Sequence, residues 1–193
     1  MLPQPLVYVR DLLHGFPRPW FFCGGWAGDA WLGRETRRHG DVDVAVVHSD
    51  QRAIFEHLPG WALVGHDPSV PDDTTEQWNG RHLDLPAHIH VPTPGSSLST
   101  SPALKHSAVE FEFILVERAD PELILRSDPW GLPVLAPQAV LLHKALDSGI
   151  PRRQDEQDFE ALLPTLSIAQ LGWLRDSLAR ARPGHPWLAR CCG

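Results

Sequence analysis

The sequence predicts an α+β protein with a mixed N-terminal part and a small C-terminal helical lobe. Up to residue 130, short apolar runs typical of strands alternate with segments whose apolar residues recur at helical spacing. From residue 131 onward, every predicted regular element is a helix. We therefore expect one domain over residues 1–130 and a helical lobe over residues 131–193.

The first predicted elements lie before residue 60. Apolar residues three and four positions apart predict a helix over Leu6 to Leu13, and Pro19 to Cys23 is a short apolar run typical of a buried strand. A helix should run from Gly25 to Leu32. Alternation then predicts a strand over Asp41 to Val47, and a helix should follow from Ser49 to Leu58.

The later elements follow from the same patterns. Proline, glycine and polar residues predict loops over residues 67–80 and 92–106. The remaining predicted elements are strands at Trp61–Val64, His88–Val91 and Val109–Val116, and helices at Gln138–Leu146, Arg152–Pro164 and Ile168–Ala181.

Asp41 and Asp43 form the first candidate site. Residues two apart on a strand project from the same face, so these carboxylates should lie side by side. Two adjacent carboxylates repel each other unless a cation lies between them, and Mg²⁺ prefers hard oxygen ligands. The pair therefore predicts a magnesium site.

Gly24 and Gly25 form the second candidate site, between a predicted buried strand and a predicted helix. Glycine lets a ligand approach the backbone closely, and a helix N-terminus offers unpaired N–H groups and a positive dipole end. This combination favours the binding of a polyphosphate.

These motifs occur in an order that resembles the nucleotidyltransferase superfamily typified by DNA polymerase β. The pattern Gly24-Gly25-Trp26-Ala27-x-Asp29, Gly33, Arg37-x-His39 and Asp41-x-Asp43 is most similar to the aminoglycoside 2''-adenylyltransferase branch. The resemblance implies a polymerase β-like mixed sheet flanked by helices. It also implies transfer of a nucleoside monophosphate, with ATP favoured as donor, to a hydroxyl of a small acceptor such as an aminoglycoside-like antibiotic.

The resemblance further implies a two-metal Mg²⁺ site completed by a third carboxylate on a neighbouring strand. Glu112 fits best, because Phe111 and Phe113 on the opposite strand face would anchor it in the core. Asp84 is the alternative, although Pro86 places it at a strand start. Glu112 would bind metal, act as base toward the acceptor hydroxyl, or both.

Arg37 and Lys144 are the candidate cations for the nucleotide phosphates. Arg34 and Arg38 lie in the same basic loop, and one of the three arginines is expected to contact the triphosphate while the others are solvated. Lys144 has an equal alternative as an ordinary lysine of an amphipathic helix. Asp155 and Asp158 share one helical face, which favours a structural role in holding basic side chains. His88 and His90 share a strand face, but without a third partner they are interpreted as surface residues rather than a zinc site.

Composition narrows the class of partner. The 193 residues carry a formal net charge of -7, which disfavours a protein that grips long nucleic acid. No secretory signal or membrane-spanning run is recognisable, so we expect a cytoplasmic protein. Two alternatives stay open: a toxin-type nucleotidyltransferase that modifies protein or RNA, and a catalytically idle relative that only binds nucleotide.

Overall fold

The computed structural model describes residues 1–71, 74–98, 101–126, 130–147 and 150–191. The chain forms two compact units. Unit 1 comprises residues 1–22 and 39–121, and unit 2 comprises residues 23–38 and 122–193. The predicted division at residue 130 remains a prediction.

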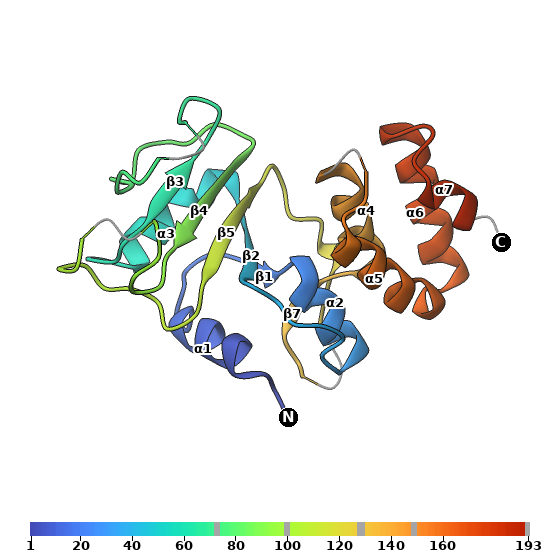
Figure 1. Cartoon of the computed structure of the whole chain (residues 1–193), viewed down its shortest axis with the longest axis horizontal. Helices are drawn as coiled ribbons and strands as arrows, with labels where there is room; N and C mark the ends of the chain where they lie inside the picture. Colours follow the sequence, from blue (N-terminus) through green and yellow to red (C-terminus); the bar gives the residue numbers. More distant parts are fainter. Residues whose placement is uncertain (72–73, 99–100, 127–129, 148–149, 192–193) are drawn as a thin grey trace. The chain divides into compact units, whose positions relative to one another are not determined.

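In unit 1, five strands lie side by side in the order β3-β4-β5-β2-β1 (Figure 1). Strands β2 and β5 are parallel, and the other three neighbouring pairs are antiparallel. The elements are α1 (Gln4–Leu12), β1 (Trp20–Phe22), β2 (Val42–Val47), the 3₁₀ turn η1 (His48–Asp50), α3 (Gln51–His57), β3 (Val64–His66), β4 (Ala87–Val91) and β5 (Phe111–Val116).

The alternation of the sequence gives the central strands two different faces. Along β5, Phe111 and Phe113 are fully buried, whereas Glu112 between them is half-buried. The same alternation in β4 buries Ile89 and leaves His88 and His90 half-buried. One face of the sheet is therefore part of the apolar core, and the polar side chains gather on the other.

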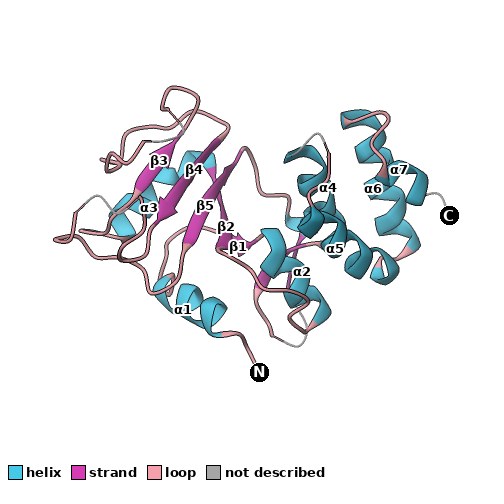
Figure 2. Ribbon diagram, in the orientation of Figure 1, coloured by secondary structure: helices cyan, strands magenta, loops and turns pink. Residues whose placement is uncertain are grey.

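Unit 2 is mostly helical (Figure 2). Its core includes Trp187 of α7, whose ring stacks on Phe159 of α5 with centroids 4.3 Å apart. The elements are α2 (Gly24–Leu32), the 3₁₀ turn η2 (Pro121–Leu123), an antiparallel pair of β6 (Ile124–Arg126) and β7 (Pro133–Leu135), α4 (Pro137–Asp147), α5 (Arg153–Leu162), the 3₁₀ turn η3 (Leu163–Thr165), α6 (Ile168–Ala181) and α7 (Trp187–Arg190).

Local sequence explains where the unit 2 helices begin and end. Ser167 caps α6: its hydroxyl accepts from the Gln170 N–H, and the Gln170 side chain accepts from the Ser167 N–H. Helix α2 ends at Gly33, which adopts a left-handed conformation with φ of 67°. Glycine reaches this conformation without the strain that a Cβ atom would cause.

The structure confirms the α+β class and the mixed sheet, and it corrects several elements. The strand predicted at Trp61–Val64 lies at Val64–His66, because those residues pair with β4. Strands β6 and β7 and helix α7 were not predicted. Among the described residues, no helix is both long enough and apolar enough to span a membrane.

Candidate functional site

The side chains of Asp41, Asp43 and Glu112 come together in unit 1. One carboxylate oxygen from each residue lies within 4.8 Å of the other two. Asp43 and Glu112 occupy paired positions of the parallel strands β2 and β5, and Asp41 directly precedes β2. Asp41 is exposed, and the other two residues are half-buried. The group can therefore offer oxygen ligands to a hard cation.

Asp84 is not a member of this group. Its side chain is 84% exposed and lies 3.7 Å from Nε2 of His82, while its backbone N–H donates to the carboxylate of Asp67. Asp84 precedes β4 rather than belonging to it. The geometry favours Glu112 over Asp84, and the assignment of a third metal ligand remains a prediction.

Gly24 and Gly25 form the first turn of helix α2 in unit 2. Gly24 has a φ of +61°, a conformation that favours glycine over residues with a Cβ atom. The N-cap position is Cys23 rather than a Ser, Thr, Asp or Asn, whose side-chain oxygen would accept from the first N–H groups. A helix start of this kind suits the binding of a phosphate. Phosphate binding by Gly24 and Gly25 remains a prediction.

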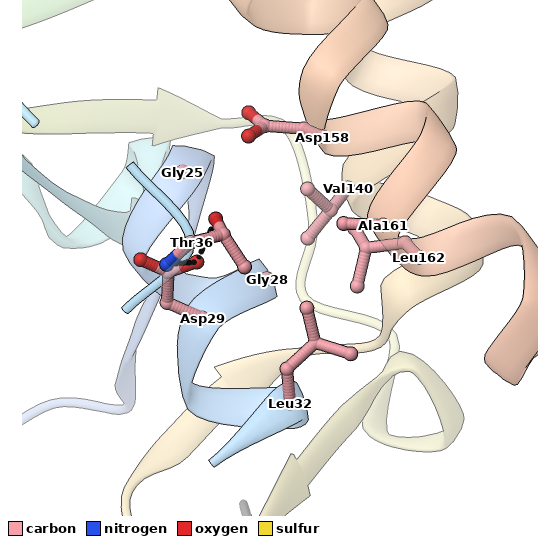
Figure 3. A pocket seen from close by; sticks show the side chains of 9 residues that line it. All are labelled: Gly25, Gly28, Asp29, Leu32, Thr36, Val140, Asp158, Ala161 and Leu162. Atoms are coloured by element: carbon pink, nitrogen blue, oxygen red, sulfur yellow. Dashed lines mark hydrogen bonds between the residues drawn. The ribbon is translucent and has the colours of Figure 1, made fainter. Parts of the chain in front are cut away.

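Asp29, another residue of the motif, has a structural role that the sequence did not reveal. It is fully buried, and its carboxylate accepts hydrogen bonds from the backbone N–H and the hydroxyl of Thr36. Figure 3 shows Asp29 and Thr36 joined in this way, which holds the segment after α2. Arg37 follows Thr36 directly in the sequence. Asp29 thereby fixes the position of this basic segment within unit 2.

The same view shows a small pocket between α2 and α5 (Figure 3). Gly25, Gly28 and Asp29 of α2 line it together with Asp158 and Leu162 of α5. A Cβ atom at Gly28 would lie 3.1 Å from the Leu162 side chain, so a glycine here lets the two helices pack closely. Most of the residues that line this pocket serve to pack the helices together, and we assign no function to it.

Arg37 and Lys144 lie in one ion-pair network of unit 2. Arg37 donates two hydrogen bonds, of 2.8 and 2.9 Å, to the carboxylate of Asp158. Nζ of Lys144 lies 2.7 Å from Asp158 and 3.3 Å from Asp155, which also binds Arg152. The predicted structural role of Asp155 and Asp158 is confirmed by these contacts. The nucleotide-binding role of Arg37 and Lys144 stays a prediction.

The network shifts the ionisation of its members. Burial alone would raise the pKa of Asp158, but the hydrogen bonds and charges of Arg37 and Lys144 lower it overall. The pKa of Asp155 is likewise lowered, because Arg152 and Lys144 outweigh its burial. Both carboxylates therefore remain ionised at neutral pH, and together they hold Arg37, Lys144 and Arg152.

His66 is a candidate residue that the sequence analysis missed. The register of β3 and β4 sets it opposite His88, and the three residues His66, His88 and His90 bring a ring nitrogen each within 4.8 Å of the others. The interpretation of His88 and His90 as surface residues without a third partner is therefore wrong. Only the pairing of the two strands could reveal this partner, because residues 66 and 88 are distant in sequence.

Known proteins resemble this chain in sequence and in fold. Residues 5–70 match the sequence model of a family described as aminoglycoside-2''-adenylyltransferase. No curated protein matches the chain in sequence. The solution structure of the antibiotic-resistance factor ANT(2'')-Ia is 12% identical with a TM-score of 0.57, and the similarity covers 91% of this chain and 89% of that one.

Two further solved structures have the same fold. The crystal structure of ANT(2")-Ia in complex with adenylyl-2"-tobramycin is 13% identical with a TM-score of 0.57, covering 91% of this chain and 95% of that one. The lincosamide antibiotic adenylyltransferase LnuA, bound to lincomycin, is 17% identical with a TM-score of 0.54, covering 86% and 99%. The chain therefore has the nucleotidyltransferase fold, and its predicted resemblance to the aminoglycoside 2''-adenylyltransferase branch of that superfamily is confirmed.

Proposed function

We propose that this protein transfers a nucleoside monophosphate, AMP from ATP, to a hydroxyl group of a small antibiotic-like acceptor. The observation that carries this proposal is the group of three carboxylates formed by Asp41, Asp43 and Glu112. Their oxygens lie close enough to share a cation, and two of them come from paired positions of neighbouring strands. A resemblance in sequence over residues 5–70 supports the same reaction class.

The three residues fit Mg²⁺ by the chemistry of their donor atoms. All three offer oxygen, which Mg²⁺ prefers, and their partial exposure leaves room for water and phosphate ligands. Asp41, Asp43 and Glu112 would hold the metal. Bound Mg²⁺ would offset the negative charge of the triphosphate and stabilise the charge of the leaving pyrophosphate.

In the proposed reaction, the oxygen of the acceptor hydroxyl attacks the α-phosphorus. The bond between this phosphorus and the oxygen that bridges to the β-phosphate breaks, and pyrophosphate leaves. The hydroxyl proton passes to a carboxylate, for which Glu112 is our candidate. Gly24 and Gly25 would hold the β- and γ-phosphates through backbone N–H groups.

Arg37 and Lys144 are proposed to add positive charge for the triphosphate. Each side chain contacts Asp158 in the structure, so each would have to exchange or share this partner with a phosphate oxygen. Such an exchange replaces one anionic partner by another of similar hydrogen-bonding geometry. The cost of the exchange would therefore be modest for Arg37, whose planar guanidinium suits either anion.

The acceptor class rests on the relatives. The structures with the same fold contain adenylyl-tobramycin in one case and lincomycin in another. These are hydroxyl-bearing small molecules. We extend this class, an antibiotic-like molecule with a free hydroxyl, to the present chain. The formal net charge of -7 is compatible with a cationic acceptor.

Incubation with labelled nucleoside triphosphates tests the proposal. Each triphosphate, labelled at the α-phosphate, is combined with Mg²⁺ and a panel of aminoglycosides and lincosamides, and pyrophosphate release and product mass are measured. The expected result is an acceptor heavier by one nucleoside monophosphate, formed fastest with ATP. Nucleotide binding without product from any acceptor would indicate an idle relative, and label on protein or RNA would indicate a toxin-type enzyme; both would overturn the proposal.

A further inference from the structure

Three histidines lie on the polar face of the unit 1 sheet. His66 ends β3 opposite His88 of β4, and His90 lies two residues further along β4, so all three side chains project from the same face. One ring nitrogen from each lies within 4.8 Å of the other two. The three ring nitrogens are therefore close enough together for one bound ion to contact all of them.

The rings pack against one another. The His66 and His88 rings stack with centroids 4.8 Å apart, and His90 meets both rings edge-on at 5.1 and 4.8 Å. His66 is buried and the other two are half-buried. Buried and half-buried strand positions are normally filled with β-branched or carbocyclic aromatic side chains, which pack without ring nitrogens. Apolar packing alone does not explain three imidazoles here.

His90 also contacts the carboxylate group described above. Nδ1 of His90 lies 3.3 Å from Oε2 of Glu112, its neighbour in the register of β4 and β5. A proton on Nδ1 would face this carboxylate and leave the lone pair of Nε2 for a ligand. Pairing of one ring nitrogen with a carboxylate is a common way of orienting a metal-binding histidine.

We propose that His66, His88 and His90 bind a transition-metal dication of the Zn²⁺ type. Zn–N bonds of about 2.0–2.1 Å set the nitrogens of a tetrahedral site about 3.3 Å apart, so the rings would have to move closer together. The His66 and His88 rings, which stack with an interplanar angle of 12°, would also have to turn so that their lone pairs meet at one ion. Three protein ligands leave the fourth coordination position to solvent. The half-buried side chains of His88 and His90 give solvent access to this position.

The ligand atoms distinguish this site from the carboxylates. Imidazole nitrogen suits Zn²⁺, Co²⁺, Ni²⁺ and Cu²⁺, whereas carboxylate oxygen suits Mg²⁺. The sheet would therefore carry two cation sites of different selectivity on one face, joined by the contact between His90 and Glu112.

Cobalt titration of the metal-free full chain tests the proposal without nucleotide or acceptor. Co²⁺ reports its own coordination, because four-coordinate sites with nitrogen ligands absorb visible light far more strongly than six-coordinate oxygen sites. The expected result is a strong visible spectrum that saturates at one equivalent and is abolished by Zn²⁺. A weak six-coordinate spectrum in the wild-type protein would overturn the proposal, and this reading does not depend on any variant.

Variants then locate the metal. Loss of a residue that only orients a metal ligand typically weakens metal binding by about 10–100-fold. His88→Ala removes a ligand itself and should weaken Zn²⁺ binding by more than this. The matched control His14→Ala changes an exposed histidine of the same unit and should leave the spectrum unchanged. If His88→Ala does not fold, as judged by circular dichroism, His88→Gln replaces it.

The double variant Asp41→Asn/Asp43→Asn removes the carboxylate pair and should retain the cobalt spectrum. Loss of the spectrum in this variant, or retention of wild-type affinity after substitution of His88, would assign the metal to other residues and refute the histidine site. Because no turnover is measured, failure of this proposal leaves the proposed nucleotidyl transfer untouched, and the reverse also holds.

Discussion

Glu112 lies opposite Asp43 in the register of two parallel strands, β5 and β2. Side chains at paired positions project from the same face, so the strand pairing itself delivers the third carboxylate to the other two. Phe111 and Phe113 fix this orientation, because both are fully buried on the opposite face. Two of the three carboxylates thus stand on paired strands, and Asp41 directly precedes β2.

Removal of a carboxylate charge should abolish transfer. We expect Asp43→Asn to lower kcat by about 10²–10³-fold or more, because one of the charges that stabilise the metal and the transition state is lost. Stability should be unchanged or slightly raised, since repulsion between adjacent carboxylates is relieved. Pyrophosphate release and thermal unfolding measure the two effects, and full activity in a folded variant would disprove the metal assignment.

The third carboxylate is tested by a matched pair of substitutions. Glu112→Gln keeps the shape of the side chain but removes its charge and basicity, so kcat should fall by about 10²–10⁴-fold. Asp84→Asn should change kcat by less than about twofold, because its exposed side chain lies outside the carboxylate group. The opposite ranking of the two variants would transfer the role to Asp84.

A second matched pair tests the proposed phosphate contact at α2. Gly24→Ala and Gly33→Ala each introduce a Cβ atom at a positive φ, of 61° and 67°, at the two ends of the same helix. Each should destabilise the protein by about 1–2 kcal/mol. Only Gly24→Ala should also raise the nucleotide dissociation constant, by about tenfold. Isothermal titration calorimetry that finds equal affinities for both variants would contradict the contact.

The ion pairs of Asp158 should matter for folding. Its side chain is 5% exposed and holds both Arg37 and Lys144, so Asp158→Asn leaves two cations without a full counter-charge. We expect a loss of about 3–5 kcal/mol in the free energy of unfolding. The control Glu56→Gln breaks an exposed pair with Arg52 and should cost at most about 0.5 kcal/mol. Urea unfolding compares them, and equal losses would exclude a special role for Asp158.

The same network predicts a dependence of stability on pH. The pKa values of Asp155 and Asp158 are lowered in the folded protein below the ordinary aspartate value of 3.8. Their contribution should therefore be complete above about pH 5 and decrease as the pH falls below 4. In Asp158→Asn this acid-dependent loss should be smaller. Urea midpoints between pH 7 and pH 3 that run parallel for the two proteins would argue against the shift at Asp158.

Alternation predicted the carboxylate strands well. The buried phenylalanines on either side of Glu112 gave both the strand and the face of its carboxylate. The pattern at Asp41 and Asp43 worked for the same reason, although β2 begins only at Val42. Such patterns are local, because the side-chain period of a strand is set by its own backbone.

Features that depend on which strands pair with each other could not be predicted from the sequence. The run Trp61–Val64 is apolar enough for a strand, but pairing with His88–His90 selects Val64–His66 instead. His66 consequently escaped notice as a partner of the two histidines. Strands β6 and β7 have three residues each, too few for a period to show.

The parallel pairing of β2 and β5 also affects the order in which the protein folds. Strands β3 and β4 and helix α3 all lie in the chain between these two neighbours. Contacts between residues so distant along the chain pay a large loop-closure entropy and form slowly. Asp41 and Asp43 come from one short segment, whereas Glu112 joins them only once β5 has docked. We therefore expect the capacity to bind Mg²⁺ at the three carboxylates to emerge late in refolding, after most of the helical signal has returned.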